Sequence, residues 1–492
     1  MISLYKQNES FIFIDAPLDC AIDISETFSF FAENYFFSPK YKAGIWDGKI
    51  KLFNIKTGLF PIGLYDPLIK HLELHKMDYE IDPKLEETGK KFSIKKIKEF
   101  SVEKLHLPEN IEPRDYQIQG VQFSLYKKKC IILSPTASGK SLIIYILFNI
   151  IRYLNKNSKF LLVVPTTSLV EQMYSDFIEY SKNFCDYSTH IQKIYSGQDK
   201  TLERTITIST WQSLQNFPID YFKKFTCVVC DECHTAKAQE LTNILHQCIN
   251  ADFKIGLSGT LQKSHIDKLQ LQSIFGKIYR VETTKHLMER GLLSNLLITG
   301  LILKYPDDIR YKAKKLCWKD EVAYTQTLTD RIKVMMKLCF SDKNTLILFK
   351  SVDYGRLLYK LFKNKYPDKI IEYVDGSISV KKREEIRLGC EKNDNTVIIA
   401  SFGVFSTGVN IKNLHNIIFA ESSTSIIRIL QSIGRLLRLH KEKKCANLFD
   451  ICDYLQWKKR ENYGMKQFYE RTQIYEKEGF NFNIKEIELK SK

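Results

Sequence analysis

Short apolar segments alternate with longer stretches of helical character from residue 113 onward. The first series of such segments covers residues 130–133, 160–164, 206–209, 227–230 and 255–257. A second series covers residues 345–349, 370–373, 397–400, 417–420 and 446–449. Segments that are apolar throughout predict strands covered on both faces, and therefore parallel sheets flanked by helices. The pattern predicts an α/β fold with two parallel-sheet domains in tandem.

The first hundred residues follow a different pattern, which predicts a small α+β domain. Residues 11–14 are typical of a short strand, and residues 40–53 predict a hairpin that turns at Asp47-Gly48, a dipeptide suited to tight turns. A charged stretch at residues 82–99 predicts a linker. We expect an N-terminal domain at 1–98, parallel-sheet domains at 99–280 and 281–456, and a charged helical tail at 457–492.

Composition supports a protein of several domains with a polyanionic partner. The 492 residues suggest roughly three domains at about 150 residues each, and the net charge is +17. Such an excess favours nucleic acid, although a lysine bias that only aids solubility is the alternative. Residues 1–100 hold 14 Lys, no Arg and 15 acidic residues. The N-terminal domain can therefore attract nucleic acid only through a local patch.

Cysteine usage and hydropathy indicate the compartment. The 12 cysteines are scattered without a disulfide framework, which suits a reducing cytosol. The N-terminus lacks the pattern of a signal peptide, and no apolar run approaches the ~18 residues that span a bilayer. We expect a cytoplasmic protein with no membrane partner.

A phosphate-binding loop is predicted directly after the first strand of the first series. It consists of Ser134, Pro135, Thr136, Ala137, Ser138, Gly139, Lys140 and Ser141. In such a loop backbone N–H groups hold the phosphates of ATP, the lysine neutralises the β and γ phosphates, and the next hydroxyl binds Mg²⁺. Ser134 stands where the usual pattern has its first glycine. The alternative is a loop that ends in lysine by chance.

Two carboxylates follow the strand predicted at residues 227–230. Asp231 suits a Mg²⁺ ligand, and Glu232 suits the base that orients and deprotonates the attacking water. An acidic helix cap would explain one carboxylate but explains the pair poorly. Cys230, Cys233 and His234 also match a haem-attachment pattern. A strand points Cys227 and Cys230 to opposite faces, so we interpret the thiols as core residues.

Two further polar segments complete the candidate ATP site. Gln117 can pair with adenine, and Arg114 or Tyr116 can stack on it; alternatively, all three merely begin a helix. Further along, Gln431 precedes two arginines, which the spacing places on one helical face. Arg435 and Arg438 can stabilise charge on the γ-phosphate as arginine fingers do, unless they only form a solvated basic helix.

Taken in order, these segments resemble the motifs of superfamily-two helicases, and more closely those of a phage branch of DNA helicases. The motifs are Tyr116-Gln117, residues 135–141, Pro165-Thr166-Thr167, Ser209-Thr210-Trp211-Gln212, Asp231-Glu232-Cys233-His234, Ser258-Gly259-Thr260 and residues 431–438. Trp46-Asp47-Gly48 and residues 400–408 and 412–415 point to the phage branch. The resemblance implies two tandem RecA-like motor domains that close on ATP and ratchet along a strand.

The resemblance also assigns roles by position. It implies contacts with the nucleic-acid backbone for Pro165, Thr166, Thr167, Thr210, Trp211, Gln212, Phe349, Lys350 and Ser401. It implies coupling of hydrolysis to domain movement for Ser258, Gly259 and Thr260. Gly408 and Asn410 match a site near the ATP ribose, although Asn410 stands where many relatives have Asp.

Basic and aromatic residues lie together around the predicted hairpin. This patch consists of Lys40, Lys42, Trp46, Lys49 and Lys51. Such interleaving suits a duplex backbone or an unpaired base, whereas the alternative is an edge strand protected by lysines with Trp46 in the core. The resemblance favours a domain that recognises branched DNA.

We therefore expect an ATP- and Mg²⁺-dependent DNA helicase that unwinds or branch-migrates forks, D-loops, R-loops or Holliday junctions in phage recombination, repair and replication. The expected partners are branched DNA, RNA–DNA hybrids, and phage single-stranded-DNA-binding and recombination proteins, with a monomeric helicase in the host cytoplasm. The alternatives are an RNA helicase that melts duplexes locally, and a strand-annealing or DNA-structure-binding protein switched by ATP. A restriction-enzyme motor is a weaker alternative.

Overall fold

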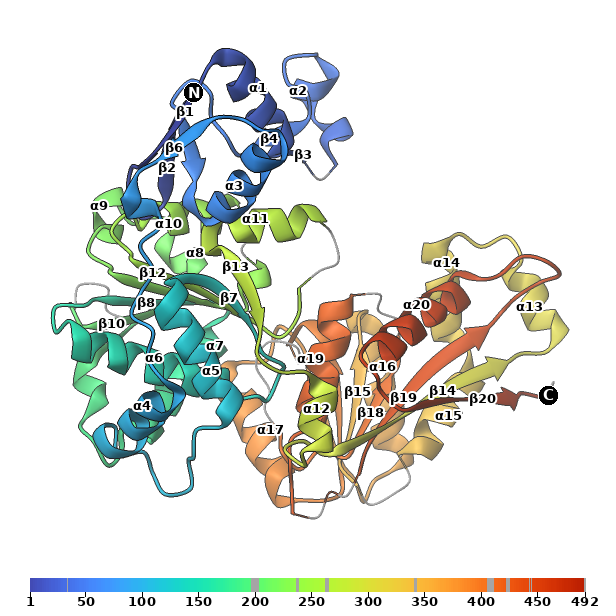
Figure 1. The fold of residues 1–492 in the computed structure, drawn as a ribbon. Coiled ribbons are helices and arrows are strands. Elements are labelled where there is room, and N and C mark those ends of the chain that lie inside the picture. Colours follow the sequence, from blue (N-terminus) through green and yellow to red (C-terminus); the bar gives the residue numbers. More distant parts are fainter. Residues whose placement is uncertain are drawn as a thin grey trace. The chain divides into compact units, whose positions relative to one another are not determined.

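The computed structural model divides into two compact units (Figure 1). It describes residues 1–32, 34–195, 203–235, 239–261, 265–339, 343–404, 411–421, 425–441, 443 and 445–490. The first unit comprises Met1–Ser134 and Gly139–Val281, and the second comprises Pro135–Ser138 and Glu282–Lys492. Among the described helices, none has the length and apolar character needed to cross a membrane.

The N-terminal domain of the first unit is built on a four-stranded sheet. Its strand order is β5 (Leu59–Pro61), β2 (Phe11–Asp15), β1 (Ile2–Lys6) and β6 (Tyr79–Ile81). Alternate side chains of β1 and β2 enter a core that α1 (Leu18–Thr27) and α3 (Tyr65–Leu74) complete. The strand expected at residues 11–14 is thus present, and a small α+β domain is confirmed.

The hairpin predicted at residues 40–53 is wrong. Residues 39–42 form the helical turn α2 (Pro39–Lys42), which Pro39 begins at its first position. The strand β4 (Lys49–Lys51) pairs instead with β3 (Ser29–Phe31), antiparallel. Proline fixes φ near the helical value and lacks the N–H that a ladder needs, so the chain turns into a helix before the strand begins.

The first motor domain is a seven-stranded parallel sheet. Its order is β13 (Lys277–Arg280), β7 (Lys129–Leu133), β12 (Phe253–Ser258), β11 (Cys227–Asp231), β8 (Phe160–Val164), β10 (Ile206–Thr210) and β9 (Ile191–Ile194). One face packs on α5 (Asp115–Lys127), α6 (Lys140–Leu154) and α7 (Thr167–Ser181). The other packs on α8 (Trp211–Leu214), α9 (Ile219–Phe222), α10 (Gln239–Gln247) and α11 (His265–Phe275).

The thiols near the predicted carboxylates belong to the two cores of this sheet. Cys227 is buried in the core on one face, and Cys230 and Cys233 are buried in the core on the other. Successive residues of a strand point to opposite faces, which accounts for the split. Burial raises the pKa of all three thiols, so they remain neutral, as core residues do.

The second motor domain repeats the architecture with a seven-stranded parallel sheet. Its order is β16 (Ile370–Val374), β17 (Thr396–Ser401), β15 (Thr345–Phe349), β18 (Asn416–Phe419), β19 (Cys445–Tyr454), β14 (Asn295–Lys304) and β20 (Phe482–Glu488). Its helices include α12 (Thr284–Glu289), α13 (Asp307–Ala313), α14 (Trp318–Thr327), α15 (Thr329–Leu338), α16 (Val352–Lys365), α17 (Val380–Lys392) and α19 (Ile426–Leu436). Two RecA-like parallel sheets are thus confirmed.

The segment expected to be a helical tail is part of this second sheet. It contains α20 (Tyr463–Lys477), and then β20, which pairs with β14 in parallel from Ile298↔Phe482 to Lys304↔Glu488. The sequence of β20 mixes three apolar residues with polar and charged ones, and most of its residues are exposed because the strand lies at the edge of the sheet. It therefore lacks the continuous apolar run by which the other strands were predicted.

A buried ion pair fixes α20 to the sheet. Arg471 Nε and Nη2 each donate to Asp450 on β19 at 2.8 Å, and Tyr475 OH donates to the same carboxylate at 2.8 Å. Both charged side chains are fully buried. The Asp450 carboxylate raises the pKa of Arg471 despite the burial of the guanidinium, so Arg471 keeps its charge inside the protein.

The N-terminal domain is joined to the amino-terminal ends of the first motor sheet. Lys129 Nζ lies 2.6 Å from Glu9 Oε2. Lys254 Nζ donates to Ser10 Oγ at 2.5 Å, and Ser10 Oγ donates to the carbonyl of His246 at 2.7 Å. We call these contacts the seam. The two lysine contacts are charge-assisted, and the one made by Lys254 is buried, so they fix the two domains of this unit to each other.

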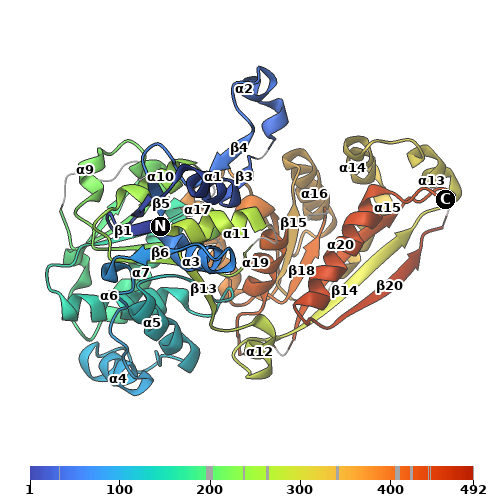
Figure 2. The ribbon, with the colours of Figure 1, turned by 45° about the horizontal axis from the view of Figure 1, so that its top comes forward.

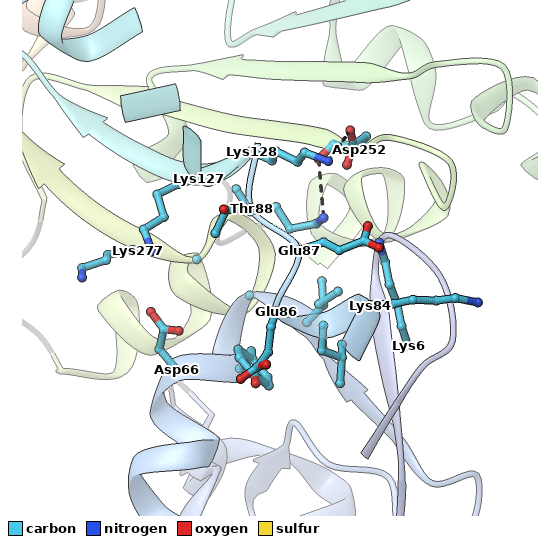
Figure 3. Close-up of a pocket in the computed structure, with 16 residues that line it drawn as sticks. Lys6, Asp66, Lys84, Glu86, Glu87, Thr88, Lys127, Lys128, Asp252 and Lys277 are labelled. Carbon is cyan, nitrogen blue, oxygen red and sulfur yellow. Dashed lines mark hydrogen bonds and ion pairs between the residues drawn. The ribbon is translucent and has the colours of Figure 1, made fainter. Parts of the chain in front are cut away.

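A pocket of about 290 Å³ opens along the seam (Figure 3). Lys127 and Lys277 line it from the motor domain, and Asp66 and Glu86 line it from the N-terminal domain. At its edge Lys128 Nζ lies 3.0 Å from Asp252. Lysines and carboxylates thus line the same pocket, which suits contact between two domains better than the binding of a polyanion.

We predict that Arg471→Met lowers the free energy of unfolding of the second unit by about 3–5 kcal/mol, because it leaves a carboxylate buried without its cation. Arg471→Met combined with Asp450→Leu should recover most of that loss. The control Lys382→Met removes an exposed partner of Glu385 and should change stability by less than about 0.5 kcal/mol. Calorimetric unfolding of the full chain measures all three, and equal losses in the single and double variants would contradict the prediction.

Candidate ATP site and nucleic-acid interface

The predicted phosphate loop joins β7 to α6 in the first motor domain. Gly139 caps the N-terminus of α6 in the left-handed conformation, with φ +79°. A Cβ at this position would lie 2.3 Å from Gln117 Nε2, so both the backbone angle and the space require glycine. The N-terminus of α6 directs backbone N–H groups and the positive end of the helix dipole toward the loop, an arrangement that binds phosphate.

The lysine of the loop lies beside the two predicted carboxylates. Lys140 Nζ is 2.8 Å from Glu232 Oε1 and 3.9 Å from Asp231 Oδ1. Asp231 is the last residue of β11, and Glu232 follows with φ +51°. Residues 92 positions apart meet here because parallel strands end at the same edge of a sheet. The sequence-predicted lysine, metal ligand and base are therefore brought together.

Burial and charge act in opposite directions on this cluster. Burial raises the pKa of Asp231 to about 6, despite the nearby Lys140 ammonium. Burial also acts on Glu232, but Lys140 and His234 outweigh it and hold the pKa of Glu232 well below its usual range. The two carboxylates raise the pKa of Lys140 in spite of its burial. Lys140 and Glu232 thus form a charged pair inside the protein.

The residues near Asp231 fit a divalent cation. Asp231 Oδ1 is buried and accepts no hydrogen bond from the described part of the chain. A buried carboxylate oxygen without a donor is costly, and oxygen ligands are those that Mg²⁺ prefers. The predicted second ligand, Ser141 Oγ, lies 2.8 Å from Tyr180 OH, which orients the hydroxyl.

His234 links the carboxylates to the segment predicted to couple hydrolysis to movement. Its Nδ1 lies 3.3 Å from Glu232 Oε2 and 3.0 Å from Ser258 Oγ. Ser258 Oγ in turn donates to the carbonyl of Thr260 at 2.7 Å and accepts from the N–H of Thr260 at 3.3 Å. Gly259 lies between them. The sequence pattern predicts no role for His234 at the ATP site, although its place two residues after the base is a signal for one.

The residues predicted to meet adenine are held at the start of α5. Arg114 N donates to Gln117 Oε1 at 2.8 Å, and Gln117 Nε2 donates to the carbonyl of Gly139 at 3.3 Å. The amide of Gln117 thus ties α5 to the phosphate loop. Tyr116 is buried, so of the two planar side chains Arg114 is the one that can stack on a base.

The rest of the loop adopts a defined backbone. Ser134 N donates to the carbonyl of Ser258 at 3.0 Å, which ties the loop to the end of β12. Ser138 Oγ donates to the carbonyl of Pro135 at 2.6 Å. Ala137 has φ +67°, and Thr136 precedes it. Positive φ values at Ala137 and Gly139 are the kind of backbone turn that can direct N–H groups toward an anion.

The first set of predicted nucleic-acid contacts follows β8 and β10 at the carboxyl edge of the sheet. Pro165 and Thr166 come directly after β8, where Thr166 Oγ1 accepts from the N–H of Leu169 and caps α7, which begins at Thr167. Thr210 ends β10, paired with Val164 of β8, and is followed by Trp211 and Gln212 in α8. These segments and the phosphate loop thus lie along one edge of the same sheet.

In the second motor domain, the predicted contacts differ in exposure. Lys350 and Ser401 follow or end the adjacent strands β15 and β17. Phe349 is fully buried and its ring stacks on Tyr373, so its side chain serves the core and cannot reach a backbone outside. Gly408 and Asn410 lie outside the described residues.

The two predicted arginine fingers do not share a helical face. Gln431 and Arg435 lie on α19, which ends at Leu436, so Arg438 lies beyond the helix. Its carbonyl accepts from Ser294 Oγ at 3.3 Å. The i, i+3 relation assumed for Arg435 and Arg438 fails because the helix ends between them.

The lysines of the N-terminal patch fall into two kinds. Lys49 and Lys51 lie 2.6 Å and 2.7 Å from the carboxylate of Glu26, which holds β4 to α1. Lys40 and Lys42 are exposed on the helical turn α2 rather than on a strand of the predicted hairpin. Trp46, the fifth residue of this patch, is half-buried. Within this patch, therefore, Lys40 and Lys42 are the lysines that form no ion pair with a described carboxylate.

Comparison with known proteins gives family matches over most of the chain. Residues 2–82 match the family "DNA helicase UvsW, N-terminal", residues 110–263 match "Type III restriction enzyme, res subunit", and residues 330–440 match "Helicase conserved C-terminal domain". The chain is 33% identical to the ATP-dependent DNA helicase uvsW of Enterobacteria phage T4 over 513 residues, which cover 99% of this chain and 100% of the relative.

More distant relatives and solved structures support the same fold. The chain is 24% identical to the DNA 3'-5' translocase XPB2 of Sulfurisphaera tokodaii, over 72% of this chain and 85% of the relative. The crystal structure of T4 UvsW matches with a TM-score of 0.53 and 31% identity over 99% of each chain. A structure of Mss116p matches with a TM-score of 0.58 at 14% identity, over 82% of this chain and 80% of the other, which shows the fold alone. This chain belongs to the UvsW family of ATP-dependent DNA helicases.

Proposed function

We propose that this helicase uses Mg²⁺-ATP to unwind or branch-migrate branched DNA, such as forks, D-loops, R-loops and Holliday junctions. The observation that carries the proposal is the buried cluster of Lys140, Asp231 and Glu232 at the carboxyl edge of the first motor sheet. The segments predicted to grip nucleic acid begin at that same edge. A change at the phosphates can therefore reach them over a short path.

The geometry suggests how this chain's residues act on ATP. Lys140 would exchange its bond with Glu232 for one with the β and γ phosphates, because a phosphate carries more charge than a single carboxylate. Glu232, released from Lys140, would then orient the attacking water and accept its proton. Asp231 and Ser141 would hold Mg²⁺, which supplies positive charge against the phosphates.

The remaining residues complete the proposal. His234 would carry the change at Glu232 to Ser258 and Thr260, since it lies within hydrogen-bonding distance of both Glu232 and Ser258. Arg435 and Arg438, with Gln431, would act on the γ-phosphate from the second motor domain. Each ATPase cycle would then shift the nucleic-acid contacts of one motor domain relative to those of the other.

The substrate class rests on the N-terminal domain. Its match to the UvsW N-terminal family supports a role in recognising branched DNA or an RNA–DNA hybrid. Phage single-stranded-DNA-binding and recombination proteins are the protein partners that we propose, with the helicase acting as a monomer in the host cytoplasm. The proposed domain limits remain 1–98, 99–280, 281–456 and 457–492, although the last segment contributes β20 to the second motor sheet.

We predict that Glu232→Gln lowers the rate of DNA-stimulated ATP hydrolysis by about 10²-fold or more while nucleotide still binds, because the base is lost and the loop is intact. Lys140→Ala should abolish hydrolysis and weaken nucleotide binding. Lys182→Ala, at an exposed lysine on the same unit, serves as a control and should match the unaltered protein. Steady-state hydrolysis and equilibrium binding of a fluorescent ATP analogue measure these effects. Normal turnover in Glu232→Gln would refute the assigned base.

A second prediction concerns the DNA. Forks, bubbles, R-loops and four-way junctions should stimulate hydrolysis and be unwound, whereas a blunt duplex should do neither well. Stimulation should fall as salt rises, because phosphate contacts release counterions. A helicase assay over this panel at a fixed salt concentration tests it. Hydrolysis that is indifferent to DNA, or equal unwinding of the blunt duplex, would contradict the proposal.

A further inference from the structure

The segment between β3 and β4 carries several exposed apolar side chains. Phe36 is 50% exposed, Phe37 is 65% exposed and Ile45 is 78% exposed. We call the segment from Tyr35 to Trp46 the aromatic tip. Figures 1 and 2 show β3, β4 and α2 projecting away from the four-stranded sheet of the N-terminal domain. Exposed apolar side chains that gather on one segment are a common feature of binding surfaces.

The aromatic tip is held in shape from within. The ring of Tyr35 stacks on Phe31 at 4.7 Å and meets Phe36 and Tyr41 edge-on at 5.6 Å and 4.8 Å. A Cβ at Gly48 would lie 2.5 Å from the Tyr35 ring, so the glycine lets the turn close onto it. Phe36 and Phe37 are therefore presented by a packed base.

The turn after the tip is fixed by hydrogen bonds. Trp46 Nε1 donates to the carbonyl of Lys49 at 2.8 Å, and Asp47 Oδ1 accepts from the N–H of Lys49 at 3.0 Å. Glu26 binds the ammonium groups of Lys49 and Lys51 and lies on α1. Through these contacts, Trp46-Asp47-Gly48 holds the tip against the rest of the N-terminal domain.

Charge distinguishes the tip from the rest of the N-terminal domain. Residues 35–46 contain two lysines and no acidic residue, whereas residues 1–100 as a whole carry 14 lysines and 15 acidic residues. Lys40 and Lys42 are exposed on α2, next to the aromatic rings. Exposed rings beside cations suit unpaired bases, whose faces stack on aromatics while their phosphates meet lysine.

The tip is carried on a body that cannot turn freely against the first motor domain. The seam joins Glu9 to Lys129 through a partly buried ion pair and Ser10 to Lys254 through a buried, charge-assisted bond. The seam lies at the amino-terminal ends of the strands of the first motor sheet. The ATP cluster, which consists of Lys140, Asp231 and Glu232, lies at their carboxyl ends. A base held at the tip would therefore stay in fixed relation to the first motor domain.

Building on the proposed function, we infer that Phe36 and Phe37 form a base-stacking surface for nucleotides left unpaired at a DNA branch, with Lys40 and Lys42 on the adjacent phosphates. The ligand is the exposed bases of nucleic acid, and the rings distinguish a branch from a continuous duplex because only unpaired bases offer a free face. Neither phenylalanine reads sequence, so the surface accepts any base.

The test compares four double variants in the full chain, of which Phe36→Leu with Phe37→Leu separates stacking from apolar contact. Phe36→Ala with Phe37→Ala should bind a fork with unpaired arms about tenfold more weakly and unwind it more slowly, since each stacked base is worth a measurable part of the affinity. Phe36→Trp with Phe37→Trp should retain binding. The matched control Leu18→Ala with Ile22→Ala removes two apolar side chains of similar exposure from α1 and should leave fork binding unchanged.

The readouts separate this inference from the proposed function. Hydrolysis stimulated by single-stranded DNA should be the same in all variants, because the tip lies outside the motor motifs. Equal fork affinity in the alanine variant overturns the inference. So does full recovery by Phe36→Leu with Phe37→Leu, which would indicate a protein partner or a second copy rather than stacking. Absence of any DNA-stimulated hydrolysis in the unaltered protein would instead refute the proposed function.

Discussion

The buried ammonium of Lys140 between two carboxylates is the interaction on which the rest of this protein depends. A lysine inside a protein needs partners, and Glu232 at 2.8 Å with Asp231 at 3.9 Å supplies them. Those carboxylates are available because β7 and β11 run in parallel and end at one edge of the sheet. Two carboxylates against one lysine leave a negative excess in a buried site, which a divalent cation and a triphosphate can rearrange together.

ATP hydrolysis and substrate recognition are assigned to opposite edges of the first motor sheet, which joins the two sites. The ATP cluster and the segments that follow β8 and β10 lie at the carboxyl edge of the first motor sheet, while the N-terminal domain is joined at the opposite edge by Lys129 and Lys254. Most residues of β7 and β12, which connect the two edges, are buried, and packed interiors transmit strain. The N-terminal domain therefore moves with the first motor domain.

Much of this could be predicted because local sequence determined it. The buried strand β8 and residues 227–230 of β11 are apolar throughout, and the phosphate loop was predicted from residues 134–141 and the strand before them. What failed depended on distant partners: β20 is a strand only because β14 lies beside it, and β4 pairs with β3 instead of with residues 40–42. Tyr180 lay beyond prediction for the same reason, since it meets Ser141 from 39 residues away.

Other differences arose where an expected helix or side chain met the local packing. Arg438 does not lie on the helical face of Arg435, because α19 ends at Leu436. The residue at which a helix ends is hard to predict from sequence. Phe349 sits at a motif position but faces the core.

The most direct test of the role of the Lys140–Glu232 pair is a structure of the protein with Mg²⁺ and a non-hydrolysable ATP analogue. Lys140 Nζ should contact the β and γ phosphates, with Glu232 released from it. A bound nucleotide that leaves the Lys140–Glu232 pair intact would contradict the central role of that pair.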